Sequence, residues 1–173
     1  GATTIATGFV DATTTVTTGQ GFVATDPDSA NIVINTAGNG PINTAGNNEP
    51  AFSLTTVNDL TAIYDGAVTT SGTNSFGYSF NSGGTATIQV GDSTTTGDGA
   101  TGLFSGSPGD AVIIFSNVTT SGDSANGVDV AGGGNVTLTT SGNIATSGAS
   151  STGVLVGSSG HVVANLNNVS ATG

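Results

Sequence analysis

A repeat of about 25 residues constrains the fold of this chain more than any other feature of its sequence. The segment Ile42–Gly46 (INTAG) aligns with Val68–Gly72 (VTTSG) at an offset of 26, and the alignment continues without a gap through Ala51–Leu54 and Gly77–Phe80. Internal repeats of this length are typical of solenoids and related arrays, in which each copy packs on its neighbours. The repeat predicts copies that open at the following residues: Val16, Ile42, Val68, Thr94, Val118, Ile144 and Val169.

Each copy contains three short segments in which apolar residues recur at every second position, which is the periodicity of a strand. The first segment ends at a threonine, which predicts a column of Thr18, Thr44, Thr70, Thr96, Thr120 and Thr146. The second segment contributes the pairs Phe52 and Leu54, Tyr78 and Phe80, Leu103 and Ser105, Val128 and Val130, and Val154 and Val156. The third contributes Ile88 and Val90, Val112 and Ile114, Val136 and Leu138, and Val162 and Ala164. We expect all these side chains to point into a common core.

Clusters of glycine separate the segments, as at Gly83–Gly84 and Gly132–Gly134, and we expect them to supply positive φ at corners. Three strands without a helical period can bury one face only by stacking on the next copy. The sequence therefore predicts an all-β fold: a right-handed parallel β-helix (β-solenoid) with about 25 residues and three short strands per coil. The rival fold, an antiparallel sandwich, explains the alternation but not the repeat.

Length and composition indicate one domain over residues 1–173, with irregular coils in 1–41 and regular repeats in 42–173. The chain has no Lys or Arg and a net charge of -11, which argues against nucleic acid as a partner. It has no apolar run long enough for membrane insertion and no cysteine for disulfides or thiolate metal sites.

Stretches such as Val118–Gly142 (VTTSGDSANGVDVAGGGNVTLTTSG) and Ile144–Gly160 (IATSGASSTGVLVGSSG) resemble coils of bacterial autotransporter passenger domains and other secreted repeat adhesins. The shared pattern is a TSG turn, a small residue with glycine, an apolar-x-apolar pair, a glycine corner and another strand. The resemblance covers roughly 42–173 and implies a secreted, extracellular β-helix at the cell surface, used for adhesion or biofilm formation. It implies no functional residues, and the membrane-embedded barrel of a whole autotransporter has no counterpart in this sequence.

The titratable residues suggest no catalytic, cofactor-binding or metal-binding site, and we expect no cofactor and no enzymatic activity. His161 is the single histidine and reads as a corner residue. Asp92 with Asp98, and Asp123 with Asp129, are the nearest candidates for the carboxylate pair of a glycan-cleaving enzyme, but they do not recur in one column. The Asp26–Asp28 segment (DPD) is the densest acidic group and predicts weak calcium affinity at most.

Threonine columns raise ice binding as another alternative, because a flat outward array of hydroxyls can order water. The predicted outward column is Thr17, Asn43, Thr69, Thr95, Thr119 and Ala145. It is interrupted twice, which weakens this interpretation.

The termini suggest self-association. Val169–Gly173 opens an unfinished copy, and joining it to Gly1–Thr15 of a second chain gives a short coil before Val16 restores the repeat. The expected partners are therefore a second copy stacked end to end, or neighbouring coils of a longer passenger, with surface glycans as an additional ligand. The sequence predicts an extracellular structural or adhesive shaft or fibre subunit, with a glycan-active, glycan-binding or ice-binding β-helix protein as the alternative.

Overall fold

The computed structural model describes residues 3–5, 14–16, 21–26, 32–36 and 40–173, with side chains described at 21–23 and from residue 40 onward. Every regular element in this part of the chain is a β-strand, and the strands form three parallel sheets of seven, seven and six strands. We refer to them as sheets A, B and C. The all-β, three-stranded coil predicted from the repeat is confirmed.

The strands follow one another in a fixed order, so that each coil contributes one strand to sheet A, then one to sheet B, then one to sheet C. Sheet A contains β1 (Thr3–Ile5), β4 (Ile32–Thr36), β7 (Leu60–Tyr64), β10 (Ala86–Val90), β13 (Ala111–Phe115), β16 (Val136–Thr140) and β19 (Val162–Asn165). Sheet B contains β2 (Thr14–Val16), β5 (Ile42–Thr44), β8 (Val68–Thr70), β11 (Ser93–Thr95), β14 (Val118–Thr120), β17 (Asn143–Thr146) and β20 (Asn168–Ala171). Sheet C contains β3 (Phe22–Asp26), β6 (Phe52–Thr56), β9 (Tyr78–Asn81), β12 (Leu103–Ser107), β15 (Val128–Gly132) and β18 (Val154–Ser158).

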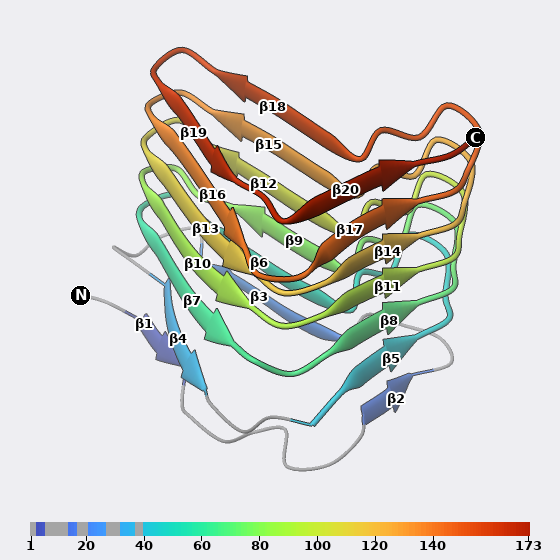
Figure 1. Ribbon diagram of the computed structural model, residues 1–173. Coiled ribbons are helices and arrows are strands. Elements are labelled where there is room, and N and C mark those ends of the chain that lie inside the picture. The colour runs from blue at the N-terminus through green and yellow to red at the C-terminus, as the bar shows by residue number, and fades with distance from the viewer. Residues whose placement is uncertain (1–2, 6–13, 17–20, 27–31, 37–39) are drawn as a thin grey trace.

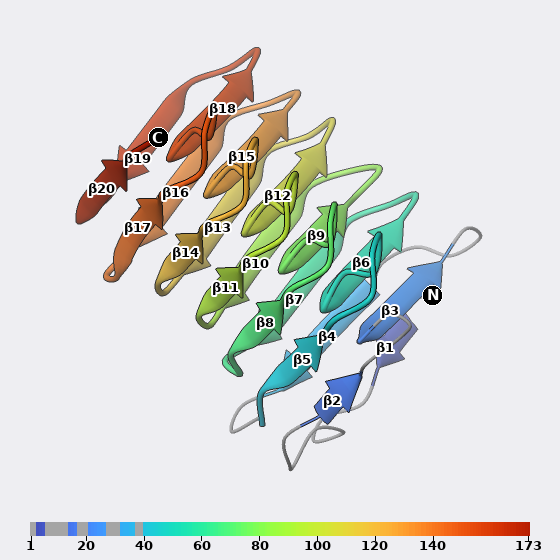
Figure 2. The same cartoon turned by 90° about the vertical axis from the view of Figure 1, so that its right-hand side faces the viewer.

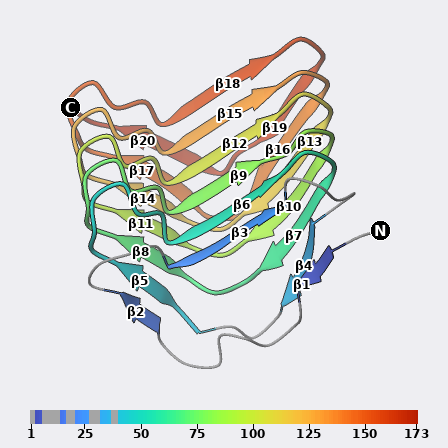
Figure 3. The ribbon, with the colours of Figure 1, turned by 180° about the vertical axis from the view of Figure 1, so that it is seen from behind.

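The coils wind as a right-handed solenoid along a nearly straight axis (Figures 1 and 2). Sheets A and B meet in a V, and sheet C lies on its inner side, opposite sheet A, as the view from behind also shows (Figure 3). Parallel strands in a sheet lie about 4.8 Å apart, which sets the rise per coil.

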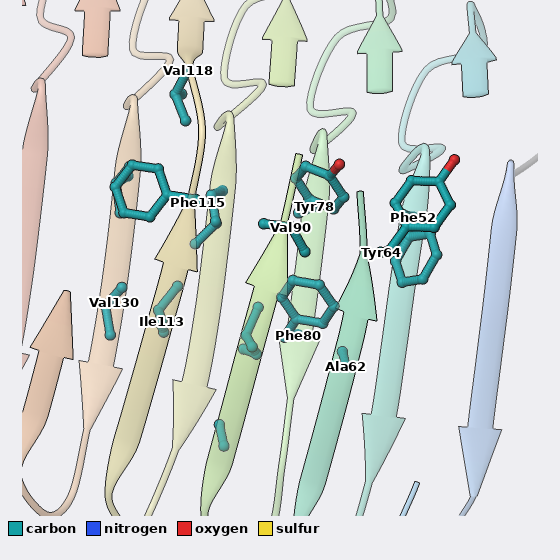
Figure 4. Packing of buried hydrophobic residues seen from close by; sticks show 14 of the residues in the cluster. Phe52, Ala62, Tyr64, Tyr78, Phe80, Val90, Ile113, Phe115, Val118 and Val130 are labelled. Carbon is teal, nitrogen blue, oxygen red and sulfur yellow. The ribbon is translucent and has the colours of Figure 1, made fainter. Parts of the chain in front are cut away.

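The core is a narrow column of apolar side chains between sheets A and C (Figure 4). Aromatic rings fill its N-terminal half: the ring centroids of Phe52 and Tyr64 lie 4.7 Å apart, and Tyr78 stacks on Phe80 at 6.0 Å. Smaller residues such as Val128 and Val136 take over in later coils. Each inward residue is covered by the equivalent residue of the next coil, so burial depends on stacking.

The predicted register of the second segment is confirmed in every coil. Phe52, Tyr78, Leu103, Val128 and Val154 are successive Cα partners across sheet C, and their i+2 neighbours pair in the same way. In sheet A, Val136 and Leu138 pair with Val162 and Ala164, as expected.

The register predicted for β13 is wrong by one residue. Val112 and Ile114 point outward and are 40% and 43% exposed, while Ala111, Ile113 and Phe115 fill the core. Leu138 therefore stacks on Ile113 rather than on Ile114. A shift of one residue moves every side chain of a strand to its other face, and five consecutive apolar residues give no alternation to fix the choice.

The first-segment column is also corrected at two places. Ser93, not Thr94, pairs with Val68 and Val118, so Thr95 replaces Thr96 in the inward column. The run Thr94–Thr96 fits the repeat in either frame. In the observed register the Ser93 hydroxyl is buried and donates a hydrogen bond to the Gly102 carbonyl oxygen at 2.7 Å. In the earliest coil, Thr14 rather than Val16 pairs with Ile42, and Val16 pairs with Thr44.

Several expectations concern residues that lie outside the described part of the chain. These residues are Thr17, Thr18, most of the Asp26–Asp28 segment and most of the Gly1–Thr15 segment that is expected to join a second chain. The division of the domain at residues 41 and 42 likewise stays a prediction.

The corner between sheets B and C has a residue in the left-handed region in each of five coils. These residues are Asn48, Asn74, Gly99, Ser124 and Ser150, with φ between 54° and 67°. Asparagine and serine supply most of them, so the expectation that the corner glycine clusters provide positive φ is wrong for the described glycines.

The glycines of the TSG turns, and Gly97 in the equivalent TTG turn, are needed for close approach instead. A Cβ added to Gly97 would lie 2.0 Å from the Gly72 carbonyl oxygen, and one added to Gly122 would lie 2.0 Å from that of Gly97. Only glycine allows the turns to stack this closely along the axis.

Candidate functional site

The aspartates at the corners are hydrogen-bond acceptors that join one coil to the next. At the corner between sheets C and A, Asp59 Oδ1 accepts hydrogen bonds from the Thr85 N–H at 2.7 Å and the Thr85 hydroxyl at 3.0 Å. These two bonds, the backbone one first, hold the pKa of Asp59 below its usual value. Asp110 Oδ1 accepts from the Asn135 N–H at 2.7 Å, which continues the column upward.

His161 ends this same column. Its backbone N–H donates to Asn135 Oδ1 at 3.0 Å, and its side chain is exposed. The interpretation of His161 as a corner residue agrees with this position.

Equivalent columns occupy the other two corners. Between sheets A and B, Asp92 Oδ1 accepts from the Asn117 N–H at 3.0 Å, and Asn117 Oδ1 accepts from the Asn143 N–H at 2.9 Å. Between sheets B and C, Asp98 Oδ1 accepts from the Asp123 N–H at 2.9 Å. Asp123 Oδ1 in turn accepts from the Ala149 N–H at 2.8 Å. Side chains thus link adjacent coils at every corner.

Neither carboxylate pair suggested by the sequence forms a joint site. Asp92 and Asp98 lie at different corners, and Asp129 is on the outer face of β15 whereas Asp123 is in a turn. Asp98 and Asp123 do share one corner column, where Asp98 accepts a hydrogen bond from the Asp123 N–H, but neither residue lines the groove on sheet A. Across the described residues, no group of three His, Cys, Asp or Glu side chains is placed to hold a metal ion. The Asp26–Asp28 segment lies largely outside the described residues.

The threonine column faces inward and bonds to the adjoining turn. Thr70 and Thr120 donate to the carbonyl oxygens of Ser75 and Ala125 at 2.7 and 2.9 Å. The outward column of sheet B, with its corrected register, is Asn43, Thr69, Thr94, Thr119 and Ala145. It remains a single interrupted row, because the described strands of this sheet from Ile42 onward are only three or four residues long.

The outer face of sheet A is a surface that the sequence analysis did not find, and its outward strand residues are uncharged. A groove of about 260 Å³ lies next to the corner with sheet B, between Ile63, Gln89 and Ile114, and the exposed Asp65 also lines it. The offset of 25 between Asp110 and Asn135 is the sequence signal that could have placed Val112 and Ile114 on this face.

The outer face of sheet C has a pair of aromatic rings. Phe76 and Phe104 stack with centroids 5.7 Å apart and an interplanar angle of 28°, and both are partly exposed. The Asn81 amide oxygen and the Phe104 ring both lie over Gly106, within 3.1 and 3.7 Å of the position that a Cβ would take there. Asp129 is the cross-strand neighbour of Phe104.

No family model, curated protein or solved structure matches the chain. The fold defines the class of protein, a three-sheet parallel β-solenoid. The part of the chain that the structure describes contains no helix that could cross a membrane.

Proposed function

We propose that this protein is an extracellular structural element, a β-solenoid shaft or fibre subunit at the bacterial cell surface. The observation that carries the proposal is the set of axial hydrogen-bond columns at all three corners. Most of the described aspartates bond to a neighbouring coil rather than converge on a cleft. Hydrogen bonds that join successive coils along one axis would resist stretching of the solenoid, as a structural element requires. The resemblance to passenger-domain coils supports the location.

The edge strands of the last coil support lengthening by coil-on-coil pairing. In each sheet, a residue at or next to the start of the strand donates its N–H to the following coil. Val136 donates to the His161 carbonyl oxygen in sheet A, Val68 to that of Asp92 in sheet B, and Val128 to that of Gly153 in sheet C. The equivalent N–H groups in the last coil belong to Val154, Val162 and Val169 on β18, β19 and β20, the edge strands of the three sheets. Open parallel edges are templates for further strands. A following coil, whether from a second copy or from a longer passenger, would continue every column.

Electron microscopy of the 173-residue chain tests the proposal. We expect filaments, whose assembly is favoured by low pH because protonation lowers the charge of -11. Val162→Pro removes the N–H that a following strand in sheet A would accept, so it should shorten or abolish the filaments. Val162→Thr keeps that N–H and serves as the matched control. Monodisperse single molecules at all pH values would overturn the proposal.

A second function, glycan binding, is favoured by the exposed pair Phe76 and Phe104. Aromatic faces flanked by the Asn81 amide and the Asp129 carboxylate resemble the mixture of apolar and polar groups found in ligand sites. Titration with neutral oligosaccharides such as cellohexaose and laminarihexaose tests it. This function is supported if the unmodified chain binds an oligosaccharide, Phe104→Ala does not bind it, and Leu155→Ala, a substitution in the same outward column, still binds it. Absence of binding by the unmodified chain would exclude this function.

A further inference from the structure

We infer that the outer face of sheet A is a lateral self-association surface, on which a second copy of this chain packs side by side. This inference concerns contacts between shafts and is separate from the end-to-end pairing proposed above, on which it does not depend.

The face consists of two outward columns that follow the solenoid axis. They contain Thr61, Thr87, Val112, Thr137 and Val163, and Ile63, Gln89, Ile114, Thr139 and Asn165. Eight of these ten side chains are β-branched and none is charged. Val112, Ile114 and Val163 are 40%, 43% and 51% exposed. A cluster of exposed aliphatic side chains on a regular sheet marks an interaction surface.

The face combines exposed apolar side chains with a recess. Val112 and Ile114 are exposed near its centre, and the groove of about 260 Å³, which Ile63, Ile114 and Asp65 line, lies at its edge toward sheet B. A two-fold interface needs side chains that project and a recess that receives them on one patch, because the same residues meet on each copy. The columns repeat with the spacing of the coils, so a second copy presents its side chains at matching intervals.

Charge selects a second copy as the occupant. The chain carries -11 and no Lys or Arg, so two copies repel wherever acidic corners meet. On sheet C, the outward position next to Phe104 is Asp129, whereas the outward positions of sheet A are neutral. The acidic residues Asp59 and Asp110 border one side of this face, and Asp92 and the groove residue Asp65 border the other. A basic partner would favour those borders, whereas a second acidic copy meets the least repulsion on the neutral columns between them.

The area of the face sets the strength of the contact. Five coils of five-residue strands make a face of about 24 Å by 16 Å, or roughly 400 Å² per copy. A standard interface buries about 800 Å² per partner, so one pair of chains should associate weakly. Copies aligned in longer shafts add such contacts in parallel, which strengthens the association without new chemistry.

Single cysteines provide a direct test, because the natural chain has none. Ile114→Cys and Thr119→Cys place one exposed thiol on sheets A and B of the same coil. Under mild oxidation at a fixed protein concentration, we expect Ile114→Cys to form disulfide-linked dimers that Thr119→Cys does not form. Because acidic rows border the face, dimer formation should increase with added salt, which screens their repulsion. Equal crosslinking of the two variants, or a decrease with salt, would overturn the inference.

A second variant separates this inference from the proposed filament. Ile114→Asp adds a charge at an exposed site and leaves the edges of the last coil unchanged, so the fold and end-to-end filaments should persist. In micrographs, we expect the unmodified chain to give paired or bundled filaments and Ile114→Asp to give single ones. If the chain does not form filaments, sedimentation at high protein concentration replaces this readout, with a weak dimer expected only for the unmodified chain. Single filaments, or monomers, from the unmodified chain would overturn the lateral surface alone.

Discussion

At the scale of single residues, the turn glycines stabilise the fold because they have no side chain, which lets the turns of adjacent coils pack closely. Gly97→Ala would place a Cβ 2.0 Å from the Gly72 carbonyl oxygen, and the nearest atoms all belong to the backbone of Gly72 and Thr73, which cannot shift easily. We expect this variant to lose more than about 2 kcal/mol of stability in urea unfolding. Gly157→Ala is the matched control, because the nearest atom to its Cβ would be the Val130 oxygen at 4.0 Å. Equal stability of the two variants would contradict the stacked-turn geometry.

Ser105 illustrates the opposite case, because removal of its hydroxyl group should increase the stability of the fold. Its hydroxyl is fully buried in sheet C and has no hydrogen-bond partner among the described residues. An unpaired buried hydroxyl costs about 1–3 kcal/mol, so Ser105→Ala should raise the unfolding midpoint. Ser107→Ala, which removes a hydroxyl that donates to the Gly84 carbonyl oxygen at 2.7 Å, should lower it. A loss of stability in Ser105→Ala would indicate a partner that the structure does not show.

At the scale of strands, β13 provides the sharpest test of register. Ile113 is buried and its neighbour Ile114 is 43% exposed, so the two residues differ in environment but not in chemistry. Ile113→Thr should cost about 2 kcal/mol or more, because it buries a hydroxyl in an apolar column. Ile114→Thr should change stability by less than about 0.5 kcal/mol, as surface substitutions usually do. Thermal melts of the two variants would decide, and a reversed order would restore the register predicted from the sequence.

Most of the architecture could be predicted from the sequence because its columns repeat residue type. Phe52, Tyr78 and Leu103 share an alternating pattern that fixes both the face and the register. The pattern fails at Ala111–Phe115 and at Thr94–Thr96, where uniform runs fit two frames equally well. The outer face of sheet A was missed for that reason, since its centre is the misplaced pair Val112 and Ile114. The aromatic pair Phe76 and Phe104 depends on two different coils, which spacing along the chain does not reveal.

At the scale of the whole molecule, the two tyrosines should control stability at high pH. The Tyr64 and Tyr78 hydroxyls donate to the carbonyl oxygens of Gly40 and Gly66, both at 2.7 Å. Burial, with a smaller contribution from the charge of Asp65, raises the pKa of Tyr64 to about 12. Burial, with smaller contributions from Tyr64, Asp92 and Asp65, also raises the pKa of Tyr78 well above its usual value.

Raised pKa values in the folded state give a definite direction to the pH dependence. The stabilisation that the protonated tyrosines give to the folded state is complete below the pKa of an unfolded tyrosine, about 10. It is lost as the pH rises through the pKa values of the folded state. The loss is up to about 1.4 kcal/mol per pH unit for each tyrosine. The chain has no Lys, Arg or Cys side chain to titrate in this range. Tyrosinate absorbance should therefore appear together with loss of the β circular dichroism signal, above pH 10. If both tyrosines ionised near pH 10 while the fold stayed intact, that result would contradict their buried positions.

The dependence of each coil on its neighbours alone has a consequence for how such a gene can change. Asp92 and Asn117 occupy the same corner position one coil apart, and Ser93 pairs with Val118. Recombination that excised Ser93–Asn117 would join Asp92 directly to Val118 and leave every remaining column in phase. Duplication of the same stretch would lengthen the molecule by one rise. A single recombination event can therefore change the number of coils, and proteins that differ by whole coils in this way can each remain folded.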